Sequence, residues 1–392
     1  MTKKNIFTRA IGFFNRMFLY LVHRAYAIIP LDEHLVVFES SLDFSDNSRV
    51  MFDYLKKNKP EYKLVWMLHG EKLPDNAPNI EVIHQFRTWH DVHVLSRAKY
   101  IFSTHVLGDL FHPRKDQMVV NLWHGIPFKG IKGHTPKKRT QFNLMMCLGE
   151  MNIDTTAKFV GCDRSLMRPW GYPRIDLLYS CRDVGRNNPF APNDFTGRLI
   201  IWMPTFRKSV ASHLSEDSCD SETGLPLLVH NKNLEEFNGF LQSINVVFIV
   251  KIHHLQSSKD AFKHNYSNII FVQDPDISNR NLQLYEIIAK SDALLTDYSS
   301  VFADYMHMDR PIGFILDDLE NYEKSRGEFL FNPITDVLCG FHIYNYEQLK
   351  EFCIEIAENK DTTKPLRDAL INAMISYKDG NNCERIISNI LM

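Results

Sequence analysis

Polar side chains follow three buried strands that we expect in the second half of the chain. Ser299 and Ser300 stand between an apolar run typical of a strand, residues 292–295, and a run with helical spacing, Val301–Met308. Two further predicted strands in this half end beside Arg207 and His253. Parallel strands end at one edge of a sheet, so these groups should converge on one cleft wall. Hydroxyls and unpaired N–H groups at a helix start are suited to phosphate. A helix cap is the alternative role for the serines.

His124 stands in the first half of the chain, where a predicted buried strand over residues 118–123 ends. Gly125 and Pro127 force a turn there, so the imidazole should project from the carboxyl edge of the sheet, where ligands bind in open α/β folds. A histidine can accept a proton near neutral pH, as a general base must. The alternative is a histidine that packs in the core or caps an element.

A basic loop with interleaved glycines follows His124. Its cations are Lys129, Lys132, Lys137, Lys138 and Arg139. Such a loop is suited to hold a phosphorylated acceptor or to contact a lipid surface. A solvated run of charges is the alternative.

The acidic residues near the strand ends do not predict a metal site. Asp297 would repel a neighbouring phosphate, so we expect its carboxylate to bind a ligand hydroxyl or to fix the turn. Asp274 and Asp276 form a DxD pattern, but it precedes a helix without other acidic residues nearby and is typical of a loop and cap. The chain has no Walker loop and no GxGxxG, which argues against a nucleoside triphosphatase or a dehydrogenase.

The elements that must position these residues alternate between strand and helix from residue 31 onward. This alternation predicts an α/β fold of parallel sheets with helices on both faces. Ser180–Gly197 is rich in Gly, Asn and Pro and is typical of a linker, after which the alternation restarts. We therefore expect an N-terminal Rossmann-like domain over residues 31–185 and a C-terminal one over residues 186–392. The polar, Ser-rich residues 208–231 predict a surface insertion.

Composition fits a soluble globular protein of two domains. The chain has 392 residues, of which 44% are hydrophobic and 23% charged. Its 45 Lys and Arg residues nearly balance 47 Asp and Glu residues, so no global field points to nucleic acid. Seven cysteines without a CxxC pair indicate neither a zinc site nor a disulfide framework, and they fit a reducing cytoplasmic compartment.

The first thirty residues are a separate amphipathic segment. Ile6–Ile29 is rich in Phe, Leu, Tyr and Ile, but its longest uncharged apolar run is Met17–Val22. A spanning helix needs about twenty apolar residues. Wound as a helix at about 100° per residue, the segment gathers its cations within an arc of about 100°: Arg9, Arg16, His23 and Arg24. This pattern predicts a helix that lies in a membrane interface. A helix packed on the body of the protein is the alternative.

Taken together, a series of motifs runs along most of the chain. The first half contains Phe38-Glu39-Ser40, Ser45-Asp46-Asn47, Trp123-His124-Gly125 with Pro127 and Lys129, and Gly171-Tyr172-Pro173-Arg174. The second half contains Pro204-Thr205-Phe206-Arg207, Lys251-Ile252-His253, Thr296-Asp297-Tyr298-Ser299-Ser300 with Asp304, and Arg310-Pro311 with Asp318-Leu319-Glu320 and Arg326-Gly327. In order and spacing the series resembles the CDP-glycerol glycerophosphotransferase family, which includes teichoic-acid primases and polymerases. Ile126 and His254 depart from the family pattern and affect pocket shape more than chemistry.

The resemblance implies a GT-B architecture of two facing Rossmann-like domains, with the N-terminal amphipathic helix associating with membrane. The protein would then be peripheral, or monotopic, at the cytoplasmic face of the cell membrane. An acceptor hydroxyl, on a lipid-linked or polyol-phosphate acceptor, would attack the β-phosphorus of CDP-glycerol and expel CMP. The polymer would be teichoic acid or capsule.

The resemblance also assigns roles to residues. His124 would deprotonate the acceptor hydroxyl, and His253 would act with Ser299 and Ser300 on the donor pyrophosphate. The other donor-side candidates are Thr296, Asp297, Arg207 and Arg326. The acceptor-side candidates are Lys129, Lys132 and Asn47. We expect no cofactor and no metal ion at the diphosphate, because protein donors and a helix terminus occupy that role.

Three alternatives to transfer of glycerol phosphate stay open from the sequence. The first is transfer of ribitol phosphate or a related alditol phosphate by the same chemistry. The second is a nucleotide-sugar glycosyltransferase on the same fold, which would need a hexose pocket. The third is a catalytically silent membrane scaffold, which the presence of both histidines and the serine pair disfavours.

Overall fold

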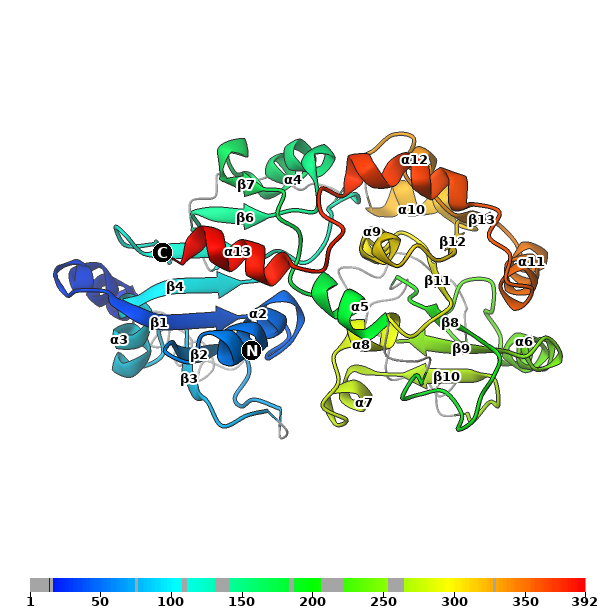
Figure 1. The fold of residues 1–392 in the computed structure, drawn as a ribbon, viewed down its shortest axis with the longest axis horizontal. Helices are drawn as coiled ribbons and strands as arrows, with labels where there is room; N and C mark the ends of the chain where they lie inside the picture. Colours follow the sequence, from blue (N-terminus) through cyan, green and yellow to red (C-terminus); the bar gives the residue numbers. More distant parts are fainter. Residues whose placement is uncertain are drawn as a thin grey trace, which may run out of the picture. The chain divides into compact units, whose positions relative to one another are not determined.

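Figure 1 shows the computed structural model of the chain, which describes residue 14 and residues 17–74, 77–107, 111–130, 141–182, 187–205, 222–252, 264–326 and 329–391. The chain divides into two compact units. Unit 1 comprises Met1–His124, Pro136–Asp176 and Asn381–Met392, and unit 2 comprises Gly125–Thr135 and Leu177–Gly380. The chain therefore passes between the units four times, after residues 124, 135, 176 and 380, and the third of these crossings is close to the linker predicted over 180–197.

Unit 1 is built on a parallel sheet with the strand order β3-β2-β1-β4-β5-β6-β7. Its strands are β1 (Asp32–Glu39), β2 (Lys63–Leu68), β3 (Glu81–His84), β4 (Ala98–Ser103), β5 (Met118–Asn121), β6 (Leu144–Met146) and β7 (Met167–Arg168). Its helices are α2 (Asp46–Asn58), α3 (Trp89–Arg97), α4 (Ile153–Val160) and α13 (Asn382–Ile390), and 3-10 turns lie at Tyr26–Ile28, Glu150–Asn152 and Arg164–Leu166. The core strands are buried on both faces, as expected of a parallel sheet covered by helices.

Unit 2 is built on a second parallel sheet with the strand order β10-β9-β8-β11-β12-β13. Its strands are β8 (Arg198–Trp202), β9 (Val246–Lys251), β10 (Ile269–Val272), β11 (Ala293–Thr296), β12 (Ile312–Ile315) and β13 (Phe341–Ile343). Its helices are α6 (Asn231–Ser243), α7 (Asp274–Ser278), α8 (Leu284–Ile288), α9 (Val301–Tyr305), α10 (Leu319–Arg326), α11 (Tyr346–Ala357) and α12 (Lys364–Met374), with 3-10 turns at Met306–Met308 and Ile334–Asp336. Helix α5 (Ile175–Arg182) begins where the chain leaves unit 1.

The two sheets share one winding. Numbered within its own unit, the unit 2 sheet runs 3-2-1-4-5-6, the strand order of a doubly wound Rossmann fold, and the unit 1 sheet has the same order with a seventh strand added after the sixth. In that order the strand connections reverse direction between the first and fourth strands, here β1 and β4 in unit 1 and β8 and β11 in unit 2. Ligands of open α/β sheets bind outside the carboxyl ends of the strands at this reversal. The topology therefore marks one candidate site in each unit.

The predicted α/β fold with two parallel sheets is confirmed. The elements that the sequence did not predict are short or weakly patterned: α4, β7, α5, α7, α10 and β13. Strand β7, for example, has only two residues and therefore no periodicity to detect. Residues 206–221, the larger part of the predicted insertion, lie outside the described residues.

The described part of the N-terminal segment is a helix over residues 17–25 that packs one face on unit 1. Leu19 and His23 are buried, and the His23 ring hydrogen-bonds to Ser96 Oγ (2.7 Å) and donates to the His112 carbonyl (3.2 Å). The prediction that His23 belongs to a cationic outer face is therefore wrong. Burial lowers the pKa of His23, so the ring is neutral. Among the described residues, no helix has both the length and the apolar character needed to cross a membrane.

The opposite face of the same segment is apolar and exposed. Phe14, Phe18 and Leu21 are 70%, 53% and 57% exposed, and Phe18 lies edge-on to the exposed Trp89. At about 100° per residue these three positions fall within about 60° of arc. One face of this helix therefore packs on unit 1, as the alternative expected, and its other face is apolar and exposed.

Candidate active site

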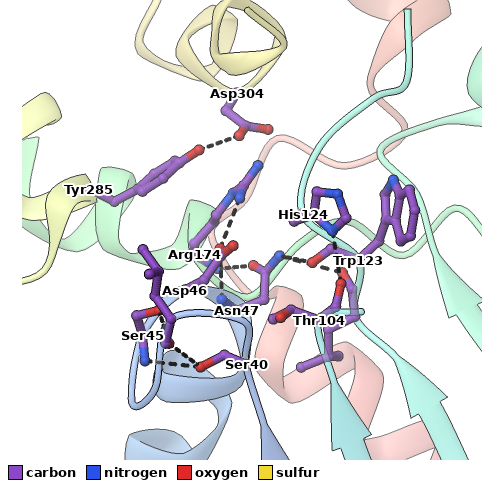
Figure 2. Close-up of polar contacts among 12 residues, drawn as sticks. Ser40, Ser45, Asp46, Asn47, Thr104, Trp123, His124, Arg174, Tyr285 and Asp304 are labelled. Atoms are coloured by element: carbon purple, nitrogen blue, oxygen red, sulfur yellow. Dashed lines mark hydrogen bonds and ion pairs between the residues drawn. The ribbon is translucent and has the colours of Figure 1, made fainter. Parts of the chain in front are cut away.

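His124 lies in a strained turn directly after β5. Trp123 has a positive φ of 55°, and Gly125 has a φ of 130°, a conformation that essentially only glycine adopts. The turn is held from outside by Asn47, whose Nδ2 donates to the Trp123 carbonyl at 2.8 Å, and Figure 2 shows this contact. Backbone and amide together fix the point at which the imidazole leaves the sheet.

A backbone carbonyl determines the tautomer of His124. Its Nδ1 lies 2.9 Å from the Thr104 carbonyl oxygen, which can only accept, so Nδ1 carries the proton (Figure 2). The neutral ring therefore has its lone pair on Nε2. Burial lowers the pKa of His124 below its ordinary value, against the opposing effect of the Thr104 bond. At neutral pH the ring is unprotonated and able to accept a proton.

A second histidine stacks on the His124 ring. The rings of His105 and His124 are 4.2 Å apart between centroids and inclined by 10°, while Trp123 lies 4.1 Å from His124. Burial, followed by the proximity of His124, lowers the pKa of His105 to about 4, so this ring is neutral as well. The two rings limit how far the His124 imidazole can rotate.

The predicted acceptor-side residue Asn47 is buried and bound on both sides of its amide. Its Oδ1 accepts from the Arg174 backbone N–H at 2.9 Å, and Arg174 in turn pairs with Asp46 at 2.8 Å (Figure 2). Asn47 thus connects the motif at 171–174 to the turn that carries His124. Its contacts are those of a residue that positions the turn.

Lys129 belongs to unit 2, in the short segment that follows His124. It forms an isolated β-bridge with Phe329, and the neighbouring Phe128 packs edge-on against Phe302 of α9 with 5.5 Å between ring centroids. Phe128 also accepts a hydrogen bond from the Leu330 N–H at 2.8 Å. Lys132 lies outside the described residues.

Ser299 and Ser300 lie at the carboxyl end of β11, beside the reversal point of unit 2, and both are partly exposed. Ser300 is the residue before α9, but its side chain makes no capping hydrogen bond. Ser299 Oγ is 3.5 Å from the Val301 N–H, at the limit of a hydrogen bond. The helix cap alternative therefore does not account for the hydroxyl of Ser300.

Thr296 and Asp297 were predicted to contact the CDP-glycerol donor. Both side chains are fully buried and hydrogen-bonded within unit 2. Thr296 Oγ1 donates to the Met203 carbonyl at 2.9 Å, and Asp297 accepts from the Thr205 N–H at 2.9 Å and from the Thr205 hydroxyl at 2.5 Å. These bonds connect the ends of β11 and β8. Of the two roles foreseen for Asp297, the structure shows the one that fixes the turn.

The remaining predicted site residues cannot be placed. Arg207 and His253 lie outside the described residues, and Arg326 is the last residue of α10, with its side chain undescribed. Asp274 pairs with Lys251 at 2.9 Å, and Asp276 caps its own helix through the Gln273 N–H at 2.8 Å. Across the described ranges no group of three or more His, Cys, Asp or Glu could hold a metal ion.

Sequence reasoning missed a polar group at the reversal point of unit 1. Glu39 ends β1 and is 1% exposed, and its Oε1 lies 2.5 Å from Nε2 of His69, which follows β2. His105 follows β4 at the same edge. All three stand just after a buried strand, the same signal that identified His124, so this criterion applied to every strand would have found them.

The comparison with known proteins identifies the family. Residues 21–392 match the family described as CDP-glycerol:poly(glycerophosphate) glycerophosphotransferase. The chain belongs to this family. The resemblance drawn from the motifs is thereby confirmed, and the chain is a transferase that moves glycerol phosphate from CDP-glycerol.

Individual relatives agree with this assignment. A teichoic acid poly(glycerol phosphate) polymerase of Bacillus spizizenii is 26% identical over 80% of this chain and 81% of its own length. One of Staphylococcus epidermidis is 24% identical over 81% of this chain, which spans only 45% of that polymerase. Proteins named as teichoic acid ribitol-phosphate primases or polymerases also match, at 21% to 24% identity. A structure of the wall teichoic acid polymerase TagF, soaked with CDPG, is similar in fold, with a TM-score of 0.76, 20% identity, and coverage of 100% of this chain and 98% of that chain.

Proposed function

We propose that this transferase primes or extends a teichoic-acid-type polymer and that His124 is its general base. The acceptor hydroxyl oxygen forms a bond to the β-phosphorus of CDP-glycerol, and its proton passes to Nε2 of His124. The bond from that phosphorus to the bridging oxygen breaks, and CMP leaves with the electron pair. The observation that carries this proposal is the 2.9 Å contact between His124 Nδ1 and the Thr104 carbonyl, which leaves Nε2 as the free acceptor.

On the donor side, the hydroxyls of Ser299 and Ser300 are proposed to hydrogen-bond the pyrophosphate. Neither hydroxyl is fully buried, and both lie where doubly wound sheets bind phosphate. His253, Arg207 and Arg326 stay predictions for the same role, because His253 and Arg207 lie outside the described residues and the Arg326 side chain is undescribed. The GT-B arrangement of the two units likewise stays a prediction.

We further propose that the protein is peripheral at the cytoplasmic face of the membrane, bound to the surface through the N-terminal helix. The exposed face formed by Phe14, Phe18 and Leu21, with Trp89 beside it, supports this proposal. Aromatic and aliphatic side chains on one face of a helix insert at the boundary between head groups and acyl chains. A lipid-linked acceptor would be reached from that position.

Nucleotide release from candidate donors tests the function. Purified protein is incubated with CDP-glycerol, CDP-ribitol or a UDP-sugar and a short glycerol phosphate chain on a soluble lipid analogue. We expect CMP from CDP-glycerol. CDP-ribitol is the second candidate donor, because ribitol-phosphate enzymes are among the relatives. Release of UDP from a UDP-sugar, with no CMP from either CDP-alditol, would contradict the proposal.

A further inference from the structure

A cavity of about 160 Å³ opens at the carboxyl edge of the unit 1 sheet. Its polar lining comes from the ends of four strands: Glu39 after β1, His69 after β2, Gln85 after β3, and His105 after β4. Ser41, Met67 and Leu107 contribute much of the remaining wall. The cavity therefore sits at the point between β1 and β4 where the topology marks a ligand site.

Two buried polar atoms in this wall have no hydrogen-bond partner among the described residues. The carboxylate of Glu39 uses Oε1 for His69, but its Oε2 accepts nothing. The side-chain amide Nε2 of Gln85 likewise donates to nothing. Buried polar groups in folded proteins are almost always paired, so an unpaired acceptor and an unpaired donor on one cavity point to a ligand that supplies both. A hydroxyl does this, since it donates one hydrogen and accepts another.

We propose that this cavity binds the terminal polyol unit of the acceptor. Its non-reacting hydroxyl donates to Glu39 Oε2 and accepts from Gln85 Nε2. The inference rests on the proposed function, because it names the part of the acceptor that unit 1 recognises.

The size of the cavity suits a three-carbon polyol. A protein cavity of about 150 Å³ accommodates benzene, which has six non-hydrogen atoms. Glycerol also has six, three carbons and three oxygens. A cavity of about 160 Å³ thus has room for one glycerol unit.

The charge around the cavity selects a neutral polyol over a phosphate. The Glu39 carboxylate raises the pKa of His69, and even a protonated His69 ring would only balance the charge of Glu39. Asp43 accepts from the His69 and Gly70 N–H groups and adds a further negative charge nearby. His105 is neutral, with its pKa lowered to about 4. No net positive charge is left for a phosphate, and an unpaired carboxylate oxygen would repel one.

The cavity lies next to the proposed base. The His105 residue lines the cavity, and its ring stacks on the ring of His124 with 4.2 Å between the ring centroids. A polyol held by Glu39 and Gln85 would therefore lie close to the proposed base.

The test uses two acceptors that differ by one hydroxyl. Both are short glycerol phosphate chains on a soluble lipid analogue, one ending in glycerol and the other in propane-1,3-diol. We expect the wild type to bind the deoxy acceptor roughly tenfold more weakly, the loss of one hydrogen bond to a charged group. Glu39→Gln should bind both acceptors alike, near the weaker value, while its CDP-glycerol affinity stays that of the wild type. All affinities are measured by calorimetry without the other substrate.

The controls separate a local effect from misfolding. Glu81→Gln alters another His–Glu pair of the same sheet, His90 with Glu81 at 2.9 Å, outside the cavity, and should change neither acceptor affinity. Gln85→Leu removes an amide nitrogen that donates to no described residue, so this variant should fold. It should also lose the preference for the glycerol terminus over the propanediol terminus. The test thus stays decisive if Glu39→Gln is unstable.

The outcomes are distinct. If Glu39→Gln and Gln85→Leu both keep the wild-type preference for the glycerol terminus, the inference is overturned. It is also overturned if Glu39→Gln weakens the binding of CDP-glycerol and leaves the affinities for both acceptors unchanged, because the cavity then binds the donor. Absence of CMP release by the wild type counts against the proposed function alone, since the acceptor affinities are measured without turnover.

Discussion

His124 is oriented by a main-chain carbonyl and confined by aromatic rings, and no described carboxylate hydrogen-bonds to its ring. A carboxylate partner would raise the pKa of the imidazole, whereas burial here lowers it. The imidazole of this proposed base is therefore unprotonated at neutral pH. Its partners, Thr104 and Asn47, act by holding position: one fixes the tautomer, the other fixes the turn.

Replacing Ser299 and Ser300 together tests the donor site at the residue scale. The double variant Ser299→Ala/Ser300→Ala should bind CDP-glycerol more weakly, because each hydrogen bond to a charged phosphate contributes about 1.5–3 kcal/mol before water replaces it. Calorimetry measures the donor affinity, and circular dichroism checks that the variant is folded. Unchanged affinity in a folded variant would return both serines to the role of helix start.

The sequence predicted the site residues unevenly, for a physical reason. His124 and the serine pair were found because each follows an apolar run and precedes a turn or helix, a local pattern. The Glu39–His69 pair joins residues from different strands, and its contact depends on strand order, which local pattern does not contain. The partner of His124 is a backbone carbonyl, which any residue type could supply.

At the scale of elements, strands with continuous apolar runs were predictable. Strand β9, which ends close to His253 as predicted, is buried along its whole length. The N-terminal helix was predicted as amphipathic, but its polar and apolar positions did not reveal that His23 packs inward. An imidazole can lie in water or in the core. The burial of His23 is explained by its hydrogen bonds to the Ser96 hydroxyl and the His112 carbonyl, which the sequence pattern does not show.

The exposed apolar face of this helix leads to a prediction about membrane binding. Phe14→Ser/Phe18→Ser/Leu21→Ser should reduce co-sedimentation with anionic lipid vesicles, because insertion scales with the apolar area buried. The triple variant is a cleaner test than removal of the segment, since Leu19 and His23 are buried on unit 1. Ile354→Ser and Leu366→Ser change exposed apolar residues of α11 and α12 and serve as the control. Equal sedimentation of wild type and triple variant would argue against the interfacial face.

A pair of glycines tests how the C-terminal helix joins unit 1. Gly171 has a φ of 85°, and a Cβ there would lie 2.2 Å from Asn382 Oδ1 of α13, so Gly171→Ala should be destabilising by about 1–3 kcal/mol. Gly239 lies within α6 and has no atom within 4 Å of a new Cβ. Gly239→Ala should therefore be stabilising by about 0.5–1 kcal/mol, through helix propensity. Urea unfolding of both variants measures the contrast. Equal effects would mean that the Asn382 contact gives way without cost.

At the scale of the whole molecule, several buried histidines make stability depend on pH. Burial lowers the pKa of His23, of His105 to about 4, of His124, and of His307 to about 3. Below the ordinary histidine pKa of about 6.5, the unfolded chain binds protons that the folded chain does not, so stability should fall as pH decreases from about 6.5 to about 4. Asp176 opposes this trend, because burial raises its pKa to about 6 and the folded state takes up its proton first.

Urea midpoints at pH 7.5 and pH 5.0 check this expectation. The wild type should unfold at lower urea at pH 5.0, and His307→Gln should show a smaller difference between the two pH values, because one titrating group is gone. A wild type that is equally stable at both pH values would contradict the sign of the argument.

The most direct test of the account is the comparison of turnover and donor affinity in His124→Ala. The account predicts that kcat falls by roughly 10²–10⁴-fold, the usual contribution of a positioned base, while CDP-glycerol affinity stays that of the wild type. The acid limb of the pH–rate profile should disappear in this variant, because that limb reports deprotonation of the base. His253→Ala, measured alongside, should lose donor affinity as well as turnover. If His124→Ala instead lost CDP-glycerol binding, or kept its turnover, the assignment of His124 as the base would be wrong.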